Sequence, residues 1–178
     1  MNIMRIIILT MLWSAVSLAD PNGIPDDPHQ LIVQVNGIVC SFCAFGTEKK
    51  LSKLDFLDKS QFGDGVLVDI RSHQVTLSLN PEVTVKYAEI ADAITKGGYD
   101  PVAYYPVIRG VLLNNEGRLE ITNPENGQVY VLPEGTEAGQ TIGQTVQCSA
   151  ELSPDAAAKY KNGDSVVLSH AVIVALEQ

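Results

Sequence analysis

Two cysteines, Cys40 and Cys43, are the residues of this sequence whose type and spacing could do chemistry. They stand three positions apart in the stretch GIVCSFCAFGTEKK (37–50), just before residues that favour a helix. Such a pair can bind a metal ion, take part in thiol–disulfide exchange, or form a lasting disulfide. Thiolates select soft ions, and two sulfurs that approach from a loop and a helix start suit the two-coordinate preference of Cu(I) or Hg(II). A zinc site would need four N or S ligands, and neither a second pair nor a histidine is evident nearby.

The segment around the cysteines predicts a strand, a loop and a helix. LIVQVN (31–36) alternates as a strand, Gly37 ends it, and a helix starts at Phe42 or Cys43. Cys40 then lies in the loop and Cys43 at the helix start, where free backbone N–H groups and the helix dipole favour negative charge. We therefore expect Cys43 to be the more acidic thiol. The predicted apolar stripe of this helix consists of Thr47, Leu51 and Leu54.

Residues 31–105 as a whole predict a ferredoxin-like domain. VLVDI (66–70) and QVTLSL (74–79) alternate as the two strands of a hairpin, and a second helix with one apolar face ends at two glycines. YDPVAYYPV (99–107) closes as a strand, whose prolines indicate an edge or strand ends. The order βαββαβ is typical of the split ferredoxin-like arrangement, with two helices on one face of a four-stranded sheet.

Three features of this segment together resemble one known family. G-x-x-C-x-x-C follows the first strand, Leu51 lies eight residues after the second cysteine, and Gly98 and Tyr99 follow the second helix. The combination resembles the heavy-metal-associated (HMA) domain, found in copper chaperones, in copper-transporting ATPases and in the periplasmic mercury-binding protein. The resemblance implies that Cys40 and Cys43 are metal ligands, with Tyr99 near the metal loop at most as a supporting residue.

Two positions beside the motif refine this interpretation. Ile38 stands where the HMA family usually has a methionine, which is mainly a packing residue, so an isoleucine of similar volume should disturb little. Val39 stands where members tuned for zinc or cadmium often carry aspartate, which favours Cu(I) or Hg(II). Thioredoxin-like enzymes usually have tryptophan before the pair and Gly-Pro within it, and this chain has neither. A disulfide remains open, because exported compartments are oxidising.

Residues 106–178 predict a small all-β domain. Five stretches alternate as strands between glycine and asparagine turns, with PDAAAKY as a short helix, and an OB-like barrel fits this pattern best. Four basic residues and two tyrosines are too few for a nucleic-acid-binding face. Cys148 alternates with apolar neighbours and is expected to be a buried thiol. A role as third ligand or resolving thiol would require it to face the first domain.

The start of the chain indicates export. Residues 1–19 combine Arg5, an apolar run and small residues before Asp20, as in a signal peptide, and residues 20–30 are polar and proline-rich enough for a flexible leader. The apolar run is too short for a comfortable membrane span, so we expect a periplasmic mature chain that is not inserted in a membrane. The formal net charge of −9 argues against nucleic acid and anionic membranes as partners.

These observations predict an exported soft-metal-binding protein, and not an enzyme, because no catalytic motif is present. Cys40 and Cys43 would hold one Cu(I) or Hg(II) ion and pass it on by thiolate exchange, acting as a chaperone or scavenger. A membrane metal transporter or an envelope protein is a possible recipient. Two alternatives stay open: a thiol–disulfide redox protein that uses the same cysteines, and an envelope interaction module whose acidic C-terminal domain docks on a partner.

Overall fold

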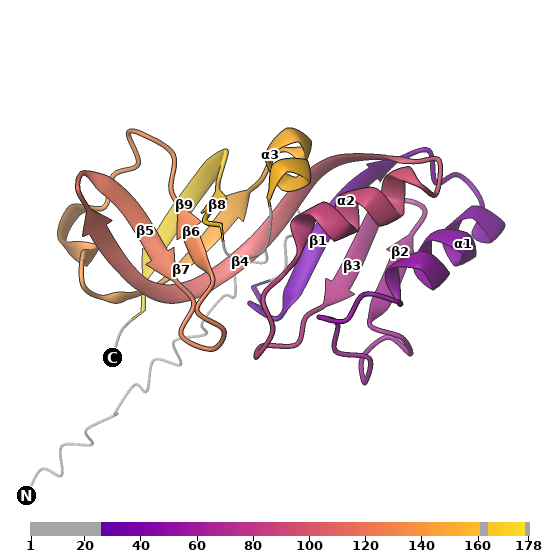
Figure 1. Ribbon diagram of the computed structural model, residues 1–178, viewed down its shortest axis with the longest axis horizontal. Coiled ribbons are helices and arrows are strands. Elements are labelled where there is room, and N and C mark those ends of the chain that lie inside the picture. The colour runs from indigo at the N-terminus through magenta and orange to yellow at the C-terminus, as the bar shows by residue number, and fades with distance from the viewer. Residues whose placement is uncertain (1–25, 161–163, 177–178) are drawn as a thin grey trace, which may run out of the picture.

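The computed structural model of the chain describes residues 26–160 and 164–176. Within these residues the chain has a mixed α+β fold, with three α-helices and a nine-stranded sheet (Figure 1). The predicted signal peptide (1–19) and positions 20–25 of the predicted leader lie outside the described residues. Gln30, the last residue of that leader, is the first residue of a strand.

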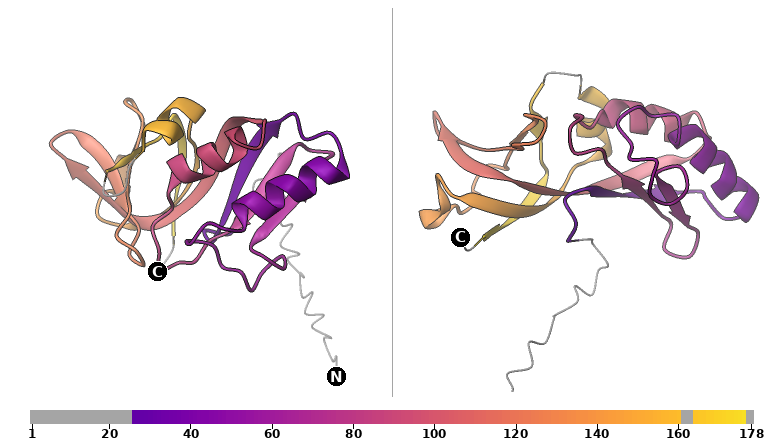
Figure 2. Two further views of the ribbon diagram at one scale, coloured as in Figure 1. Left: turned by 45° about the vertical axis from the view of Figure 1, so that its right-hand side comes forward. Right: turned by 90° about the horizontal axis from the view of Figure 1, so that it is seen from below.

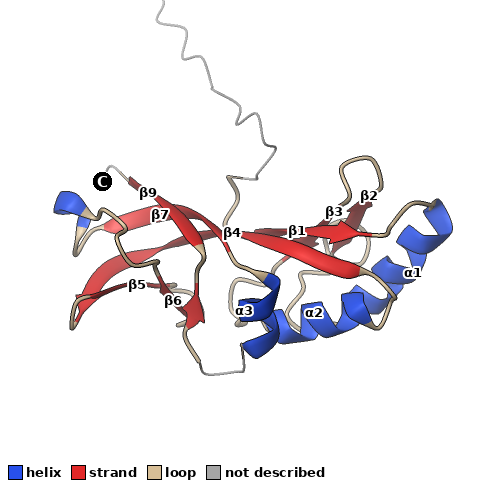
Figure 3. Cartoon of the chain, turned by 90° about the horizontal axis from the view of Figure 1, so that it is seen from above, coloured by secondary structure: helices blue, strands red, loops and turns tan. Residues whose placement is uncertain are grey.

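The N-terminal half has the predicted order of elements: β1 (Gln30–Asn36), α1 (Ser41–Leu51), β2 (Val66–Asp69), β3 (Gln74–Ser78), α2 (Tyr87–Thr95) and β4 (Asp100–Asn115). β1 pairs with β3 and β4, and β2 pairs with β3, all antiparallel. The strand order is therefore β2-β3-β1-β4, and α1 and α2 lie on one side of it (Figure 3). The predicted hairpin and both predicted helices of this half are confirmed.

The predicted apolar faces are the faces that the fold buries. Alternate residues of β1 point into the core, and residues three or four apart do so in the helices. The buried residues of these three elements include Leu31, Val33 and Val35 of β1, Ala44, Thr47 and Leu51 of α1, and Tyr87, Ile90, Ala91 and Ile94 of α2.

The C-terminal half continues the same sheet with β5 (Arg118–Thr122), β6 (Val129–Val131), β7 (Thr145–Glu151), β8 (Val166–Val167) and β9 (His170–Ala175). A 3-10 turn (Gly139–Thr141) precedes β7, and the predicted short helix is α3 (Pro154–Lys159). β4 pairs with β5 and β7, β5 with β6, β6 with β8 in parallel, and β7 with β9. The last predicted strand is thus divided into two, and the OB-like description of this half stays a prediction.

β4 belongs to both halves and runs through the predicted domain boundary between 105 and 106. Pro101 is the second residue of the strand, as expected for a strand end, whereas Pro106 lies in its interior, where the expectation was wrong. The sheet accommodates both prolines at irregular places. Pro101 lies at the register shift of the β1–β4 ladder, and Pro106 lies between Tyr104 and Val107, where the ladder to β7 is interrupted.

A buried polar contact joins the two halves beside β4. Gln128 accepts a hydrogen bond from the Val85 N–H and donates one to the Val85 carbonyl, both at 3.0 Å. Its amide group also bonds the hydroxyls of Tyr130 and Tyr160, each at 3.1 Å. Tyr160 follows α3, which lies beside α2 (Figure 2), and its ring meets that of Tyr87 edge-on. The buried apolar residues of both halves form one continuous cluster.

Candidate metal centre

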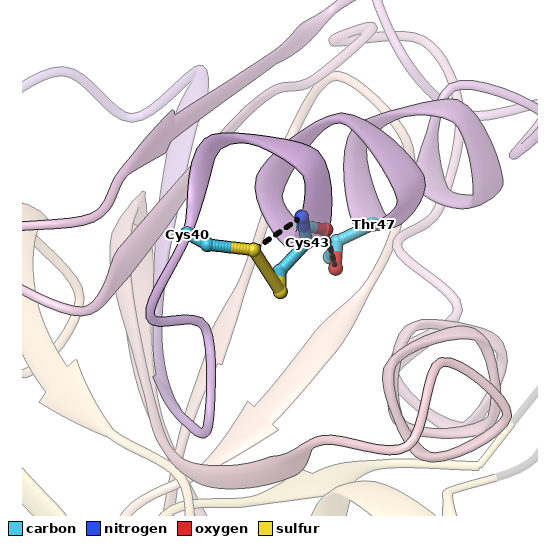
Figure 4. The surroundings of a disulfide bond; sticks show 3 residues. All are labelled: Cys40, Cys43 and Thr47. Carbon is cyan, nitrogen blue, oxygen red and sulfur yellow. Dashed lines mark hydrogen bonds between the residues drawn. A yellow bond between two sulfur atoms is a disulfide. The ribbon is translucent and has the colours of Figure 1, made fainter.

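The two cysteines lie together at the start of α1 (Figure 4). Their Cα atoms are 5.2 Å apart and the structure joins them as a disulfide. Cys40 is the N-cap residue, with extended backbone angles, and its Sγ accepts a hydrogen bond from the Cys43 N–H at 3.2 Å. A cysteine thus occupies the place that serine, threonine or aspartate usually takes at a helix start.

The position of the N-cap residue determines which of the two sulfurs the helix start would stabilise as a thiolate. The predicted helix start was Phe42 or Cys43, whereas the helix begins at Ser41 and the N–H of Cys43 donates to the sulfur of Cys40. A thiolate is stabilised by such donors and by the helix dipole. Both sulfurs are held in the disulfide here, so the expectation that Cys43 is the more acidic thiol stays a prediction. The cap contact and the exposure of Cys40, set against the half-buried Cys43, lead us to expect the favoured thiolate of the reduced protein at Cys40 instead.

A glycine turn and an aromatic ring fix the base of the cysteine loop. Gly37 has a φ of 96°, which side chains other than glycine rarely adopt, and a Cβ there would lie 3.2 Å from Cδ1 of Tyr99. A Cβ on Gly97 would lie 2.9 Å from the other edge of the same ring. Tyr99 therefore supports the loop from below. Ile38 is buried in the core, which confirms its role as a packing residue.

Thr47 is a positioning residue that the sequence showed only as part of the apolar stripe. Its side chain is buried, and its hydroxyl donates a hydrogen bond to the Cys43 carbonyl oxygen at 3.1 Å (Figure 4). A threonine bonded to the carbonyl four residues earlier is common in helices. Here the bond links the carbonyl of Cys43, in the first turn of α1, to the buried side chain of Thr47.

Three large apolar side chains that neighbour the cysteines in the sequence are exposed. Val39, Phe42 and Phe45 are exposed by 72%, 85% and 61%, and we call these three residues the apolar rim. With this exposure, the side chain of Phe42 does not pack in the core. Apolar groups collected around a reactive pair are typical of a surface that another protein covers.

Cys148 does not take part in this site. It lies in β7, fully buried, opposite Ile108 of β4, whereas the strand that leads to Cys40 ends at Asn36, opposite Asp100. Eight residues of β4 separate these two positions, which corresponds to about 26 Å. Burial raises the pKa of the Cys148 thiol to about 11. The prediction of a buried thiol is confirmed.

In the described part of the chain, no third metal-ligating side chain joins the pair. Among the described residues, no group of three or more His, Cys, Asp or Glu side chains is arranged to hold a metal ion. His73 lies in the turn between β2 and β3, and His170 is the first residue of β9.

No helix in the described part of the chain is long and apolar enough to cross a membrane.

No protein-family model and no curated protein matches this chain. Among solved structures, the chain is similar to one described as "CopZ metallochaperone", with 26% sequence identity and a TM-score of 0.35. The match covers 41% of this chain and 98% of that chain.

Proposed function

We propose that the reduced Cys40–Cys43 pair binds one soft metal ion, Cu(I) or Hg(II), and passes it to a protein partner. The observation that carries the proposal is the geometry of Cys40. Its sulfur is at an exposed helix start, within hydrogen-bond distance of a backbone N–H, and 5.2 Å separates its Cα from that of Cys43. The G-x-x-C-x-x-C motif and the residues around it, which resemble those of the HMA family, support the same assignment.

The donor set explains the choice of ion. Two thiolates are soft ligands and satisfy an ion that accepts two ligands, but they leave zinc without half of its usual set. Binding of Cu(I) displaces one proton from each thiol. Transfer then exchanges one thiolate at a time for a thiolate of the recipient, and the oxidation state of the ion does not change.

The apolar rim supports a protein as the recipient. A sulfur of the recipient must approach Cys40 closely, and we expect the recipient then to cover Val39 and Phe42, which are exposed and stand near that cysteine in the sequence. Burying apolar surface stabilises such a complex by roughly 25 cal/mol for each Å² removed from water. A transporter domain or an envelope protein with its own cysteine pair has the required chemistry.

Export of the chain is part of the proposal and rests on residues 1–19 of the sequence. In an oxidising compartment the pair forms the disulfide that the structure shows. Metal binding then requires two electrons and two protons from a dithiol reductant, which is itself oxidised to a disulfide. We therefore propose that the protein is a periplasmic chaperone or scavenger with no catalytic role.

The disulfide also favours a second candidate, thiol–disulfide exchange by the same residues. In that reaction a partner's dithiol attacks the Cys40–Cys43 bond, the partner becomes the disulfide, and this pair becomes the dithiol. An insulin-reduction assay separates the two functions. Turnover in that assay, without tight binding of Cu(I) or Hg(II), would favour the redox candidate.

The test of the proposal uses cysteine variants of the full chain. Reduced protein is loaded with Cu(I) or Hg(II) without oxygen and passed through a desalting column, and the retained metal is measured. We expect wild type and the matched control Cys148→Ala to retain one ion per chain. Cys40→Ser and Cys43→Ser should lose tight retention. Undiminished retention by the double variant would contradict the proposal.

A further inference from the structure

A second surface, far from the cysteines in the fold, has the features of a peptide-binding edge. β9 pairs with β7 on one side, and no backbone hydrogen bond reaches its other side from the described residues. Figure 3 shows β9 beside β7. An unpaired strand edge presents a row of free N–H and C=O groups to which another strand can add.

The sequence of β9 does nothing to block such pairing. HAVIVA (170–175) contains no lysine, proline or acidic residue, the devices that usually protect an edge. Val172 and Val174 are exposed by 53% and 59% on the outer face of the strand. By contrast β2, at the other end of the sheet, has four residues and ends at the exposed Asp69.

A groove runs along this edge. Its volume is about 410 Å³, and it lies between β9 and the loop formed by residues 133–137. Pockets that hold ligands usually measure about 300–1,000 Å³. Two carboxylates in the loop, Glu134 and Glu137, are exposed, and no cation pairs with them among the described residues. The groove therefore combines an unpaired backbone edge, exposed valines and negative charge.

We propose that this groove, which we call the β9 groove, binds an extended basic peptide segment of a partner protein as an added strand. Backbone bonds to β9 would hold the segment, alternate apolar side chains would cover Val172 and Val174, and lysine or arginine would meet Glu134 and Glu137. Main-chain bonds supply affinity in this mode of recognition, and alternate side chains supply specificity.

The negative charge of the groove favours a basic partner segment over segments of this chain as the occupant. A second copy that paired through its own β9 would bring two further carboxylates to each groove and no lysine or arginine from HAVIVA. Like charges brought together across an interface disfavour the complex. The segment DPNGIPDDPHQ (20–30) carries three aspartates and no lysine or arginine, so it also lacks the positive charge that would complement Glu134 and Glu137.

The experiment uses the isotope-labelled full chain and the acetylated peptide amide Lys-Val-Thr-Val-Lys. We expect the backbone amide signals of the labelled chain to shift most in residues 133–137 and 170–174 when the peptide is added. The same peptide with alternate N-methylated amides, or with glutamate in place of lysine, should bind at least tenfold more weakly. Equal binding of the N-methylated peptide, or shifts centred elsewhere, would overturn the proposal.

Two variants and one control complete the test. Val172→Lys and the double variant Glu134→Lys, Glu137→Lys change exposed side chains, and each should weaken binding of the basic peptide at least tenfold. Val102→Lys, a matched change at an exposed valine of β4 outside the groove, should leave it unchanged. Unchanged binding by both groove variants would refute the proposal, as would a concentration-dependent dimer with shifts at β9, which would identify a second copy as the occupant.

Discussion

The Sγ atom of Cys40 accepts a hydrogen bond from the backbone N–H of Cys43, at 3.2 Å, across the first turn of α1. In the reduced protein this contact and the greater exposure of Cys40 both favour its thiolate. We predict that limiting iodoacetamide alkylates Cys40 at least several-fold faster than Cys43. Mass spectrometry of the digested protein measures the two yields, and a faster Cys43 would show that the cap does not control reactivity.

Two glycines near the site should respond to alanine in opposite directions. Gly37→Ala forces a side chain into a left-handed backbone region and against Tyr99, and should lower the free energy of unfolding by about 1–3 kcal/mol. Gly46 lies within α1, and beyond its chain neighbours and the helix's own backbone no atom lies within 4 Å of the new Cβ, so Gly46→Ala should raise the free energy of unfolding by about 0.5–1 kcal/mol. Urea denaturation measures both, and the same sign for both variants would contradict the geometry.

The two halves of the chain should unfold as one unit. Gln128→Ala removes the partners of two Val85 backbone groups and two tyrosine hydroxyls, all in the buried contact that joins the halves. We expect a loss of at least about 2 kcal/mol, because buried polar groups left without partners cost about 1–3 kcal/mol.

The matched control for this variant is Gln61→Ala, at an exposed position, which should change stability by less than about 0.5 kcal/mol. Circular dichroism and tyrosine fluorescence should report a single coincident transition in wild type. Two separate transitions in wild type would show that β4 does not couple the halves.

Cys148 should stay unreactive until the protein unfolds. Burial raises its pKa to about 11, so the folded thiol is neutral at pH 8. Ellman's reagent should therefore count two thiols in reduced native protein and three in urea. Rapid reaction of all three thiols under native conditions would be inconsistent with the buried position.

The same shift gives Cys148 a pH-dependent effect on stability. The unfolded thiol loses its proton near pH 8.5, while the folded one keeps it up to about pH 11. Its contribution to stability is fully present below pH 8.5 and is lost as the pH rises toward 11. Wild type should thus lose stability more steeply than Cys148→Ala in this range, and parallel slopes in urea denaturation would refute the assignment.

The sequence predicted the N-terminal half well because its elements have simple periods. Leu31, Val33 and Val35 alternate, and Tyr87, Ile90 and Ile94 repeat at helical spacing, so the buried faces were visible before the fold was known. Pro106 suggested a strand end that is not there, because a sequence does not show where a strand ladder is irregular. The predicted domain boundary between residues 105 and 106 falls within β4, which runs across it.

The candidate site was predicted in its ligands but not in its surroundings. The spacing of Cys40 and Cys43 identified the pair, whereas the capping role of Cys40 depends on its extended backbone angles, one residue before the observed helix start at Ser41. The exposure of Phe42 and the bond from Thr47 likewise depend on how α1 packs on the sheet. Spacing alone does not decide which residues of a helix start face solvent.

The most direct measurement is an anaerobic titration of the reduced chain with Cu(I), Hg(II) and Zn(II), in which bound metal and free thiols are counted together. The proposed function predicts one Cu(I) or Hg(II) per chain, with Cys40 and Cys43 protected, Cys148 unaffected and zinc bound far more weakly. Absence of tight binding by either soft ion, or full binding with both loop thiols still free, would contradict it.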